Sequence, residues 1–259
     1  FLKWWTNGDN MNKIKVSELN TLRWQKIIKD ILVDGHSSRN TKEMIGVQSF
    51  DMNYPVISCP GRGLNTNFMI AEAAWILSGS NDISFPVKYM KIYETFSDNK
   101  VIMSGAYGPA IFRQMHYVLD TLHGDINSRQ AVLTIWTERP QQSKDIPCTV
   151  SLQFIVRDAK LHCIANMRSS DVYLGLPYDI FVFSMIATNI ANNLAVDLGY
   201  LTWQAGSAHV YNRDYENAAN CLEFRSPGSP KNGAINYNVE RHLKDILDDK
   251  LDNWVVNDE

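Results

Sequence analysis

The sequence predicts an α+β fold in which several helices pack against one mixed β-sheet. Segments with helical spacing of apolar residues are interspersed with segments that alternate as strands do. Two strand-like segments are separated only by residues 157–160, which predicts a hairpin. Residues 179–198 are apolar on nearly all sides and predict a long buried helix. With 259 residues, 45% hydrophobic and 20% charged, the chain is expected to form a single domain over 1–259.

The first half of the chain is expected to be mainly helical. Ser17 is placed to cap a helix that runs to about Val33, because apolar residues recur there at helical spacing and Gly35 ends the pattern. A strongly apolar helix over 67–77 is ended by Gly79. The other elements expected here are a strand over 44–54, a glycine- and proline-rich loop at 59–63 and a helix over 109–122.

The second half is expected to hold most of the sheet. Alternation predicts strands over 149–156 and 161–167 on either side of the turn. The remaining expected elements are strands over 131–136, 201–203 and 208–211, the helix over 179–198, a loop at 226–233 and a terminal helix over 239–247.

Charge and composition restrict the class of function. The net charge is −3, so there is no general basic field for nucleic acid. No segment is long and apolar enough to span a bilayer, and the first residues lack the layout of a secretory signal. The four cysteines are widely spaced without the pairing of a metal site, so we expect no metal and a reduced, cytoplasmic setting.

Cys148 is a candidate nucleophile, since it follows a proline and stands at the mouth of the 149–156 strand. A thiolate can form and break a covalent bond near neutral pH. A cysteine at such a position also packs commonly as a small apolar residue, so both interpretations stay open on this feature alone.

Glu72 is a candidate general acid or base, because it lies on the apolar helix 67–77. Burial there should raise its pKa towards neutrality, unless it occupies the one wet face of the helix. His209 and Tyr211 alternate on a predicted strand and should therefore point to the same side of it.

Three motifs, in this order and spacing, carry a resemblance to a known family. They are the Pro147-Cys148 pair, the run over 168–177 and the run over 208–211. The chain resembles the thymidylate synthase superfamily over about 27–211. Within it, the chain is most similar to the phage deoxycytidylate hydroxymethylases, through residues 166–169 and above all Asp179.

The resemblance implies a fold, a cofactor and partners. The fold implied is a thymidylate synthase-like domain with a mixed sheet, a long buried central helix and a sheet-to-sheet homodimer. The cofactor implied is 5,10-methylenetetrahydrofolate, and the substrate is a pyrimidine nucleotide monophosphate. Neither a membrane nor a nucleic acid is expected to be needed for activity, and the cytoplasm implied is that of a bacterium or a phage-infected cell.

The resemblance also implies roles for individual residues. Cys148 would add to carbon 6 of the pyrimidine and so activate carbon 5, Glu72 would move protons, and Tyr107 matches an active-site tyrosine. The phosphate and sugar ligands implied are Arg39, Arg129, Arg168 and Ser169 for the phosphate, and His209 and Tyr211 for the 3′-hydroxyl. The cofactor ligands implied are Asp171 for the pterin ring, Tyr93 and Phe96 where synthases usually have two tryptophans, and Gly175.

Two of these matches depart from the family pattern. Arg129 is followed by Gln130, where the family usually has a second arginine reaching into the partner subunit's site. The loop of Arg39 is shorter than in the family and lacks its usual Arg-Thr-Gly, so a solvated loop arginine is an equal alternative.

Asp179 is the residue expected to decide whether the substrate carries cytosine or uracil. Synthases that act on uracil usually have asparagine at this position, and an amide can donate to the 4-oxo oxygen. A carboxylate accepts instead from the cytosine amino group, and the pair becomes bidentate if the ring nitrogen carries a proton. The alternative is that Asp179 is the N-cap of the helix over 179–198.

The product is expected to carry a hydroxymethyl rather than a methyl group. Both products arise from a methylene intermediate, which is hydrated to give a hydroxymethyl group or reduced to give a methyl group. Access of water to the intermediate therefore decides which product forms. The polar end of the chain, residues 253–259, does not match the apolar tail that closes the synthase site. The alternatives are a CMP hydroxymethylase, a synthase that forms a methyl group on dUMP or dCMP, and a non-catalytic nucleotide- or RNA-binding relative.

Overall fold

One mixed sheet organises the protein, which was studied as a computed structural model that describes residues 16–52, 57, 59–137 and 142–223. Its six strands lie in the order β1-β2-β6-β5-β4-β3. The strands are β1 His36–Ser38, β2 Thr41–Met52, β3 Val132–Thr134, β4 Thr149–Arg157, β5 Lys160–Asp171 and β6 Asp197–Tyr211. Every neighbouring pair is antiparallel except β5 and β6. This architecture confirms the predicted α+β class.

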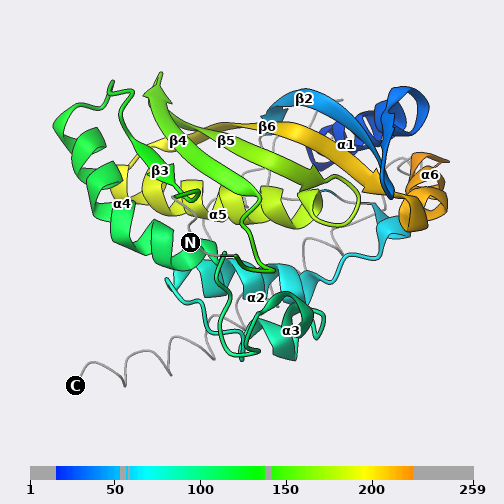
Figure 1. Cartoon of the computed structure of the whole chain (residues 1–259). Coiled ribbons are helices and arrows are strands. Elements are labelled where there is room, and N and C mark those ends of the chain that lie inside the picture. Colours follow the sequence, from blue (N-terminus) through cyan, green and yellow to red (C-terminus); the bar gives the residue numbers. More distant parts are fainter. Residues whose placement is uncertain (1–15, 53–56, 58, 138–141, 224–259) are drawn as a thin grey trace.

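Helices α5, α2 and α4 lie on one side of this sheet, with α5 directly against it (Figure 1). The helices are α1 Val16–Asp34, α2 Thr66–Leu77, α3 Tyr93–Phe96, α4 Tyr107–Gly124, α5 Leu176–Leu194 and α6 Tyr215–Glu223. Short 3-10 turns occupy Pro60–Arg62, Pro86–Lys88 and Asn212–Asp214. Within the described residues, no helix is both long enough and apolar enough to cross a membrane.

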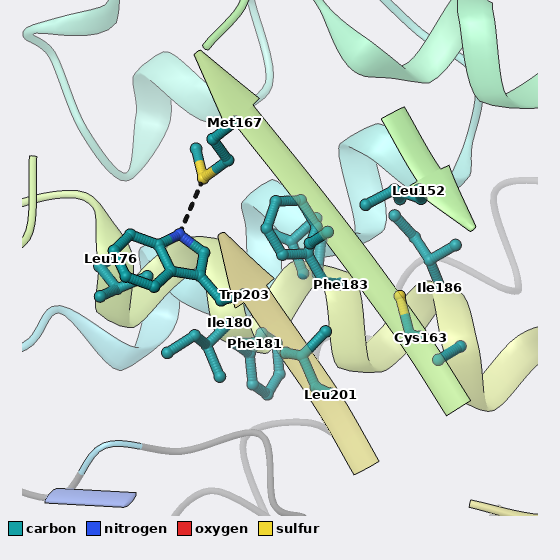
Figure 2. Close-up of a cluster of buried hydrophobic side chains, with 14 of the residues drawn as sticks. Leu152, Cys163, Met167, Leu176, Ile180, Phe181, Phe183, Ile186, Leu201 and Trp203 are labelled. Atoms are coloured by element: carbon teal, nitrogen blue, oxygen red, sulfur yellow. Dashed lines mark hydrogen bonds between the residues drawn. The ribbon is translucent and has the colours of Figure 1, made fainter. Parts of the chain in front are cut away.

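The core lies between the sheet and α5, as the apolar pattern of that helix predicts. Figure 2 shows Phe183 and Ile186 of α5 facing the sheet side chains. Trp203 is fully buried, and its indole N–H donates to the sulfur of Met167 at 3.1 Å. Because Met167 directly precedes Arg168, this packing anchors the strand where the candidate site begins.

The parallel pairing of β5 with β6 brings their C-terminal ends to one edge of the sheet. Asp171 pairs with His209 there. β4 runs antiparallel to β5, and β2 runs antiparallel to β6, so both strands begin at this same edge. Thr149 of β4 lies opposite Met167 there, and Thr41 of β2 lies opposite Tyr211. Segments far apart in sequence therefore meet at this edge.

The boundaries of the central helix and the last strand differ from the prediction. The helix runs from Leu176 to Leu194, not over 179–198, and Ala195 ends it in the left-handed conformation. Pro177 sits in its first turn, where a missing N–H costs little. β6 is then one unbroken strand, not two short ones over 201–203 and 208–211. Gly206 lets it continue, because a Cβ there would lie only 3.0 Å from the Arg168 carbonyl oxygen.

Most other elements agree with the prediction to within a few residues. The 157–160 hairpin forms, with Asp158 and Ala159 at positive φ as a two-residue turn requires. The strand predicted over 44–54 begins earlier, at Thr41, and β1, α3 and α6 were not predicted. The predicted loop at 226–233 and helix at 239–247 lie outside the described residues.

Candidate active site

Cys148 is held beside Arg168 at the start of β4. The Arg168 backbone N–H donates to the Cys148 carbonyl at 2.8 Å. Its guanidinium donates to the carbonyls of Pro147 and Ile146, each at 3.0 Å, and its Nη2 lies 3.8 Å from the Cys148 Sγ. The face of Trp136 packs against the same guanidinium, 5.5 Å from the ring centre. One arginine therefore both shapes the loop and places positive charge beside the thiol.

The pKa of the Cys148 thiol is nevertheless raised. Desolvation by burial is the main cause and outweighs the lowering by Arg168, while Asp179 and Asp145 add to the rise. Arg168 lowers the pKa of the thiol without deciding the direction of the net shift. At neutral pH the thiol is mainly protonated, so its reaction requires a proton acceptor.

Glu72 on α2 has properties of such a proton-transfer group. Burial raises the pKa of its carboxylate from 4.5 to about 7, against the lowering effect of its hydrogen bond with Tyr93. The Tyr93 hydroxyl donates to Glu72 Oε1. Rings of Phe68, Trp75 and Phe96 surround Tyr93 edge-on, with centroids 5.1, 6.2 and 6.1 Å away. Tyr93 thus lies next to the carboxylate, and Phe96 lies beyond it.

Asp179 lies within the first turn of α5, and its backbone N–H donates to the Gly175 carbonyl at 3.1 Å. Gly175 is the N-cap residue, so the interpretation of Asp179 as the N-cap is wrong. Burial, followed by the negative charges of Glu72 and Asp171, raises the pKa of the Asp179 carboxyl well above its usual range. These effects favour the neutral, protonated form of Asp179.

Tyr107 connects this group to the nucleophile. It starts α4, and its hydroxyl accepts from the Thr149 backbone N–H at 3.3 Å. Burial raises the pKa of the Tyr107 hydroxyl, and the charges of Asp179 and Cys148 raise it further. Tyr107 is therefore close enough to interact electrostatically with both Asp179 and Cys148.

A second group of polar side chains gathers at the ends of β5 and β6. Ser169 Oγ lies 3.4 Å from His209 Nδ1. The rings of His209 and Tyr211 meet edge-on at 5.2 Å, so the two side chains share a face as their alternation predicts. Burial lowers the pKa of His209, while Asp171 and Glu43 oppose that shift.

The loop from Asp171 to Gly175 is fixed by several bonds. Asp171 Oδ1 accepts from the backbone N–H groups of Tyr173 and Leu174, at 3.1 and 2.8 Å. Arg62 donates to the carbonyls of the same two residues, at 2.8 and 3.1 Å. A Cβ at Gly175 would lie 3.3 Å from the Asp171 carbonyl oxygen, so glycine permits this tight turn.

Two proposed phosphate ligands lie at the periphery. Arg39 is exposed at the tip of the β1–β2 turn, at φ 51°. This turn adjoins the end of β6, because Asn212 N–H donates to the Asn40 carbonyl at 2.8 Å. Arg129 is also exposed, and its carbonyl accepts from Gln153 inside β4, away from the Cys148 group.

The structure adds residues that sequence reasoning missed. Trp136 packs against Arg168, Arg62 holds the loop that follows Asp171, and Asp145 bonds to Gly105, two residues before Tyr107. The only sequence signal among them is Asp145, a carboxylate three residues before the candidate nucleophile. No group of three potential metal ligands occurs among the described residues.

Comparison with known proteins supports an enzyme of the one-carbon transferase class for this fold and site. Residues 22–258 match the thymidylate synthase family. The chain belongs to the thymidylate synthase family, whose members use methylenetetrahydrofolate and act on nucleotide monophosphates.

Individual relatives include a thymidylate synthase and a phage hydroxymethyltransferase. The thymidylate synthase of Vesicomyosocius okutanii subsp. Calyptogena okutanii (strain HA) is 24% identical over 88% of this chain and 90% of its own length. The deoxyuridylate hydroxymethyltransferase of Bacillus phage SP01 is 31% identical over 60% of this chain, a match that spans 46% of that relative. The solved thermostable thymidylate synthase A from Bacillus subtilis shares the fold, with a TM-score of 0.70, 24% identity and coverage of 79% of this chain and 84% of its own.

Proposed function

We propose that the protein transfers a one-carbon unit from 5,10-methylenetetrahydrofolate to carbon 5 of dCMP and hydrates it, giving 5-hydroxymethyl-dCMP. The observation that carries the choice of base is Asp179, a carboxyl group where synthases acting on uracil usually have an amide. The similarity to a phage hydroxymethyltransferase supports the choice of product.

The proposed chemistry begins at Cys148. Its thiolate forms a bond to carbon 6, which makes carbon 5 nucleophilic. Carbon 5 then bonds to the one-carbon unit and loses its hydrogen as a proton, while the bond from that unit to the folate nitrogen breaks and tetrahydrofolate leaves. Water adds to the resulting methylene group. The sulfur–carbon bond finally breaks and returns the thiolate. Glu72 suits the proton transfers, because its pKa of about 7 lets it both accept and donate near neutrality.

Asp179 is proposed to read the base as a neutral acid. Its raised pKa supports this form. The carboxyl carbonyl then accepts from the cytosine amino group, and its hydroxyl donates to the bare ring nitrogen. If the proton moves to the ring nitrogen, the same pair becomes charge-assisted. Either arrangement gives two hydrogen bonds to cytosine.

The phosphate and sugar are proposed to bind at the ends of β5 and β6. Arg168 supplies a permanent positive charge there, and Ser169 supplies a hydroxyl next to it in the chain. Arg39 would reach the phosphate from the adjoining β1–β2 turn. His209 and Tyr211, which share one face, would bind the 3′-hydroxyl.

The folate is proposed to lie against Asp171, Gly175, Tyr93 and Phe96. Bonds among the described residues engage Oδ1 of Asp171, which leaves Oδ2 to accept from an amino-substituted ring. The aromatic edges around Tyr93 suit a flat heterocycle, so the group fits the residues present. When bound, the folate supplies a carbon unit at the oxidation level of formaldehyde.

We also propose one catalytic domain over the whole chain and a homodimer formed through the sheet. Residues on the outer face of β4 and β5, including Ile155 and Ile164, are only half-buried in one protomer. Arg129 is exposed near the β3 edge, which suits a role in the partner subunit's site.

A second candidate is hydroxymethylation of dUMP. The phage relative that acts on deoxyuridylate favours it. A neutral Asp179 can accept from the uracil ring N–H and donate to the 4-oxo oxygen, so it does not exclude uracil.

Incubation with methylenetetrahydrofolate and, separately, dCMP, CMP or dUMP tests the proposal. Release of the carbon 5 hydrogen and the mass of the product are followed. We expect dCMP to react faster than CMP or dUMP and to give 5-hydroxymethyl-dCMP. A preference for dUMP or CMP would overturn the assignment of dCMP as the substrate. Formation of dihydrofolate with a methylated base would overturn the assignment of a hydroxymethyl product. The absence of turnover would favour a nucleotide-binding protein without catalytic activity.

A further inference from the structure

The segment leading into the nucleophile is anchored to a loop that is distant in sequence. Asp98 Oδ2 accepts from Ser143 Oγ at 2.5 Å, and Asp98 Oδ1 accepts from the Lys144 backbone N–H at 2.9 Å. These bonds tie residues 143–144 to the loop between α3 and α4. They are exposed and lie at the outer end of the segment.

The inner anchor is Asp145, three residues before Cys148. Its Oδ2 accepts from the Gly105 backbone N–H at 2.6 Å. The two residues are in close contact: a Cβ at Gly105 would lie 2.9 Å from the Asp145 carbonyl oxygen and 3.0 Å from its carboxyl carbon. Gly105 therefore allows an approach that any side chain would block.

The Asp145–Gly105 bond is one of two hydrogen bonds that tie the residues flanking Cys148 to the region where α4 begins. Gly105 lies two residues before Tyr107, and the Tyr107 hydroxyl accepts from the backbone N–H of Thr149, the residue after Cys148. The nucleophile thus stands between two bonds to the start of α4, one on each side. Loss of the Asp145 bond removes the tie to Gly105 on one side of Cys148, although Arg168 still holds the carbonyls of Ile146 and Pro147.

We propose that Asp145 is a positioning residue for Cys148, whose carboxylate fixes the nucleophile segment to the start of α4 and so sets where the thiol lies relative to Tyr107. This inference rests on the proposed function in taking Cys148 as the nucleophile. A hydrogen bond to a charged acceptor is among the stronger ones, and a small displacement of a reacting atom has a large effect on rate.

Asp145 also affects the thiol electrostatically, because its charge contributes to the raised pKa of Cys148. The Asp145 carboxylate therefore holds Cys148 in position but makes its thiol harder to deprotonate. This opposition separates a positioning role from an activating one: removal of the charge should make the thiol more reactive with a small electrophile but less productive with substrate.

The test compares Asp145→Ala, Asp145→Asn and Gly105→Ala in the full chain. Two quantities are measured: kcat and KM for release of the carbon 5 hydrogen, and the pH profile of Cys148 alkylation by iodoacetamide, assigned by peptide mass. We expect Asp145→Ala to lower kcat about 10- to 100-fold with a smaller change in KM. Asp145→Asn keeps an oxygen that accepts from Gly105, so it should restore most of kcat. Both should move the alkylation midpoint to lower pH.

Gly105→Ala keeps the carboxylate but pushes the two segments apart, so it should lower kcat like Asp145→Ala. It also decides the matter if Asp145→Ala does not fold. Asp120→Asn removes an exposed charge on α4 and serves as the control, with unchanged kinetics expected. Normal kcat in Asp145→Ala, or equal losses in the Asn and Ala variants, would overturn the inference. Because alkylation needs no nucleotide, and hydrogen release does not depend on the final product, a wrong product assignment would leave this test intact.

Discussion

The guanidinium of Arg168 lies 3.8 Å from the Cys148 sulfur, yet burial keeps the pKa of that thiol above its ordinary value. The same guanidinium holds the carbonyls of Ile146 and Pro147. Arg168 therefore limits the rise in the thiol pKa while it shapes the loop that carries the thiol.

Removal of the Arg168 side chain should affect both properties. In Arg168→Ala the thiol loses its nearby positive charge, so its alkylation midpoint should move to higher pH. Activity should fall about 100-fold or more, because the loop also loses two bonds. Arg168→Lys keeps the charge without the forked donors and should preserve more of the alkylation profile than of the activity. Arg113→Ala on α4 is the control, and an unshifted midpoint in Arg168→Ala would contradict this role.

Glu72 should make stability depend on pH. Its pKa is about 7 in the folded protein against 4.5 as the ordinary value, so folding favours its protonated form. The stabilising contribution is complete below pH 4.5 and is lost as the pH rises through 7, a change of roughly 3 kcal/mol.

Glu72→Gln should abolish this loss while turnover falls, since glutamine cannot transfer the proton. Urea unfolding of both proteins between pH 4 and 8 should show the variant gaining stability relative to the wild type as the pH rises. A difference in the free energy of unfolding that does not change with pH would refute the raised pKa.

Asp179→Asn should shift preference from dCMP towards dUMP. The wild-type carboxyl makes two hydrogen bonds to uracil only while it carries its own proton, so dUMP affinity should decline as the pH rises and Asp179 ionises. The amide does not titrate, so dUMP binding by the variant should lack this decline. Nucleotide binding measured across pH checks both points, and unchanged dCMP preference in the variant would show that Asp179 does not select the base.

Gly206 should be required for the pairing of β5 with β6. An added Cβ would meet the Arg168 carbonyl oxygen at 3.0 Å, and neither strand can move away easily inside the sheet. Gly206→Ala should therefore reduce the free energy of unfolding by about 1–3 kcal/mol and also lower activity through Arg168. Gly124→Ala, which has open space around it, is the matched control in thermal and urea unfolding. Equal stability of the two variants would argue against this packing constraint.

Local patterns revealed much of the fold, but tertiary contacts determined its boundaries. The apolar run around Phe183 correctly predicted a buried helix, whereas its start depended on Pro177 and Gly175, which the run does not include. The prediction divided the last strand into 201–203 and 208–211, and the close approach of Gly206 to Arg168 explains why the strand continues.

The candidate site shows the same division. Cys148 and Glu72 stand out in the sequence because each has an unusual setting. Asp145 is marked only by its place three residues before Cys148, because its partner Gly105 is 40 residues away and the contact uses a backbone N–H that no sequence pattern marks. The pKa of the Cys148 thiol could not be predicted either, since it depends on burial and on three carboxylates, of which Asp171 and Asp179 come from other segments.

The most direct test of the central claim is the origin of the new oxygen atom. The enzyme is incubated with dCMP and methylenetetrahydrofolate in water labelled with heavy oxygen, and the product is identified by mass, with Cys148→Ala as the inactive control. Hydration at this site predicts 5-hydroxymethyl-dCMP that carries one labelled oxygen, without dihydrofolate. A methylated product accompanied by dihydrofolate, or reaction with dUMP and none with dCMP, would contradict it.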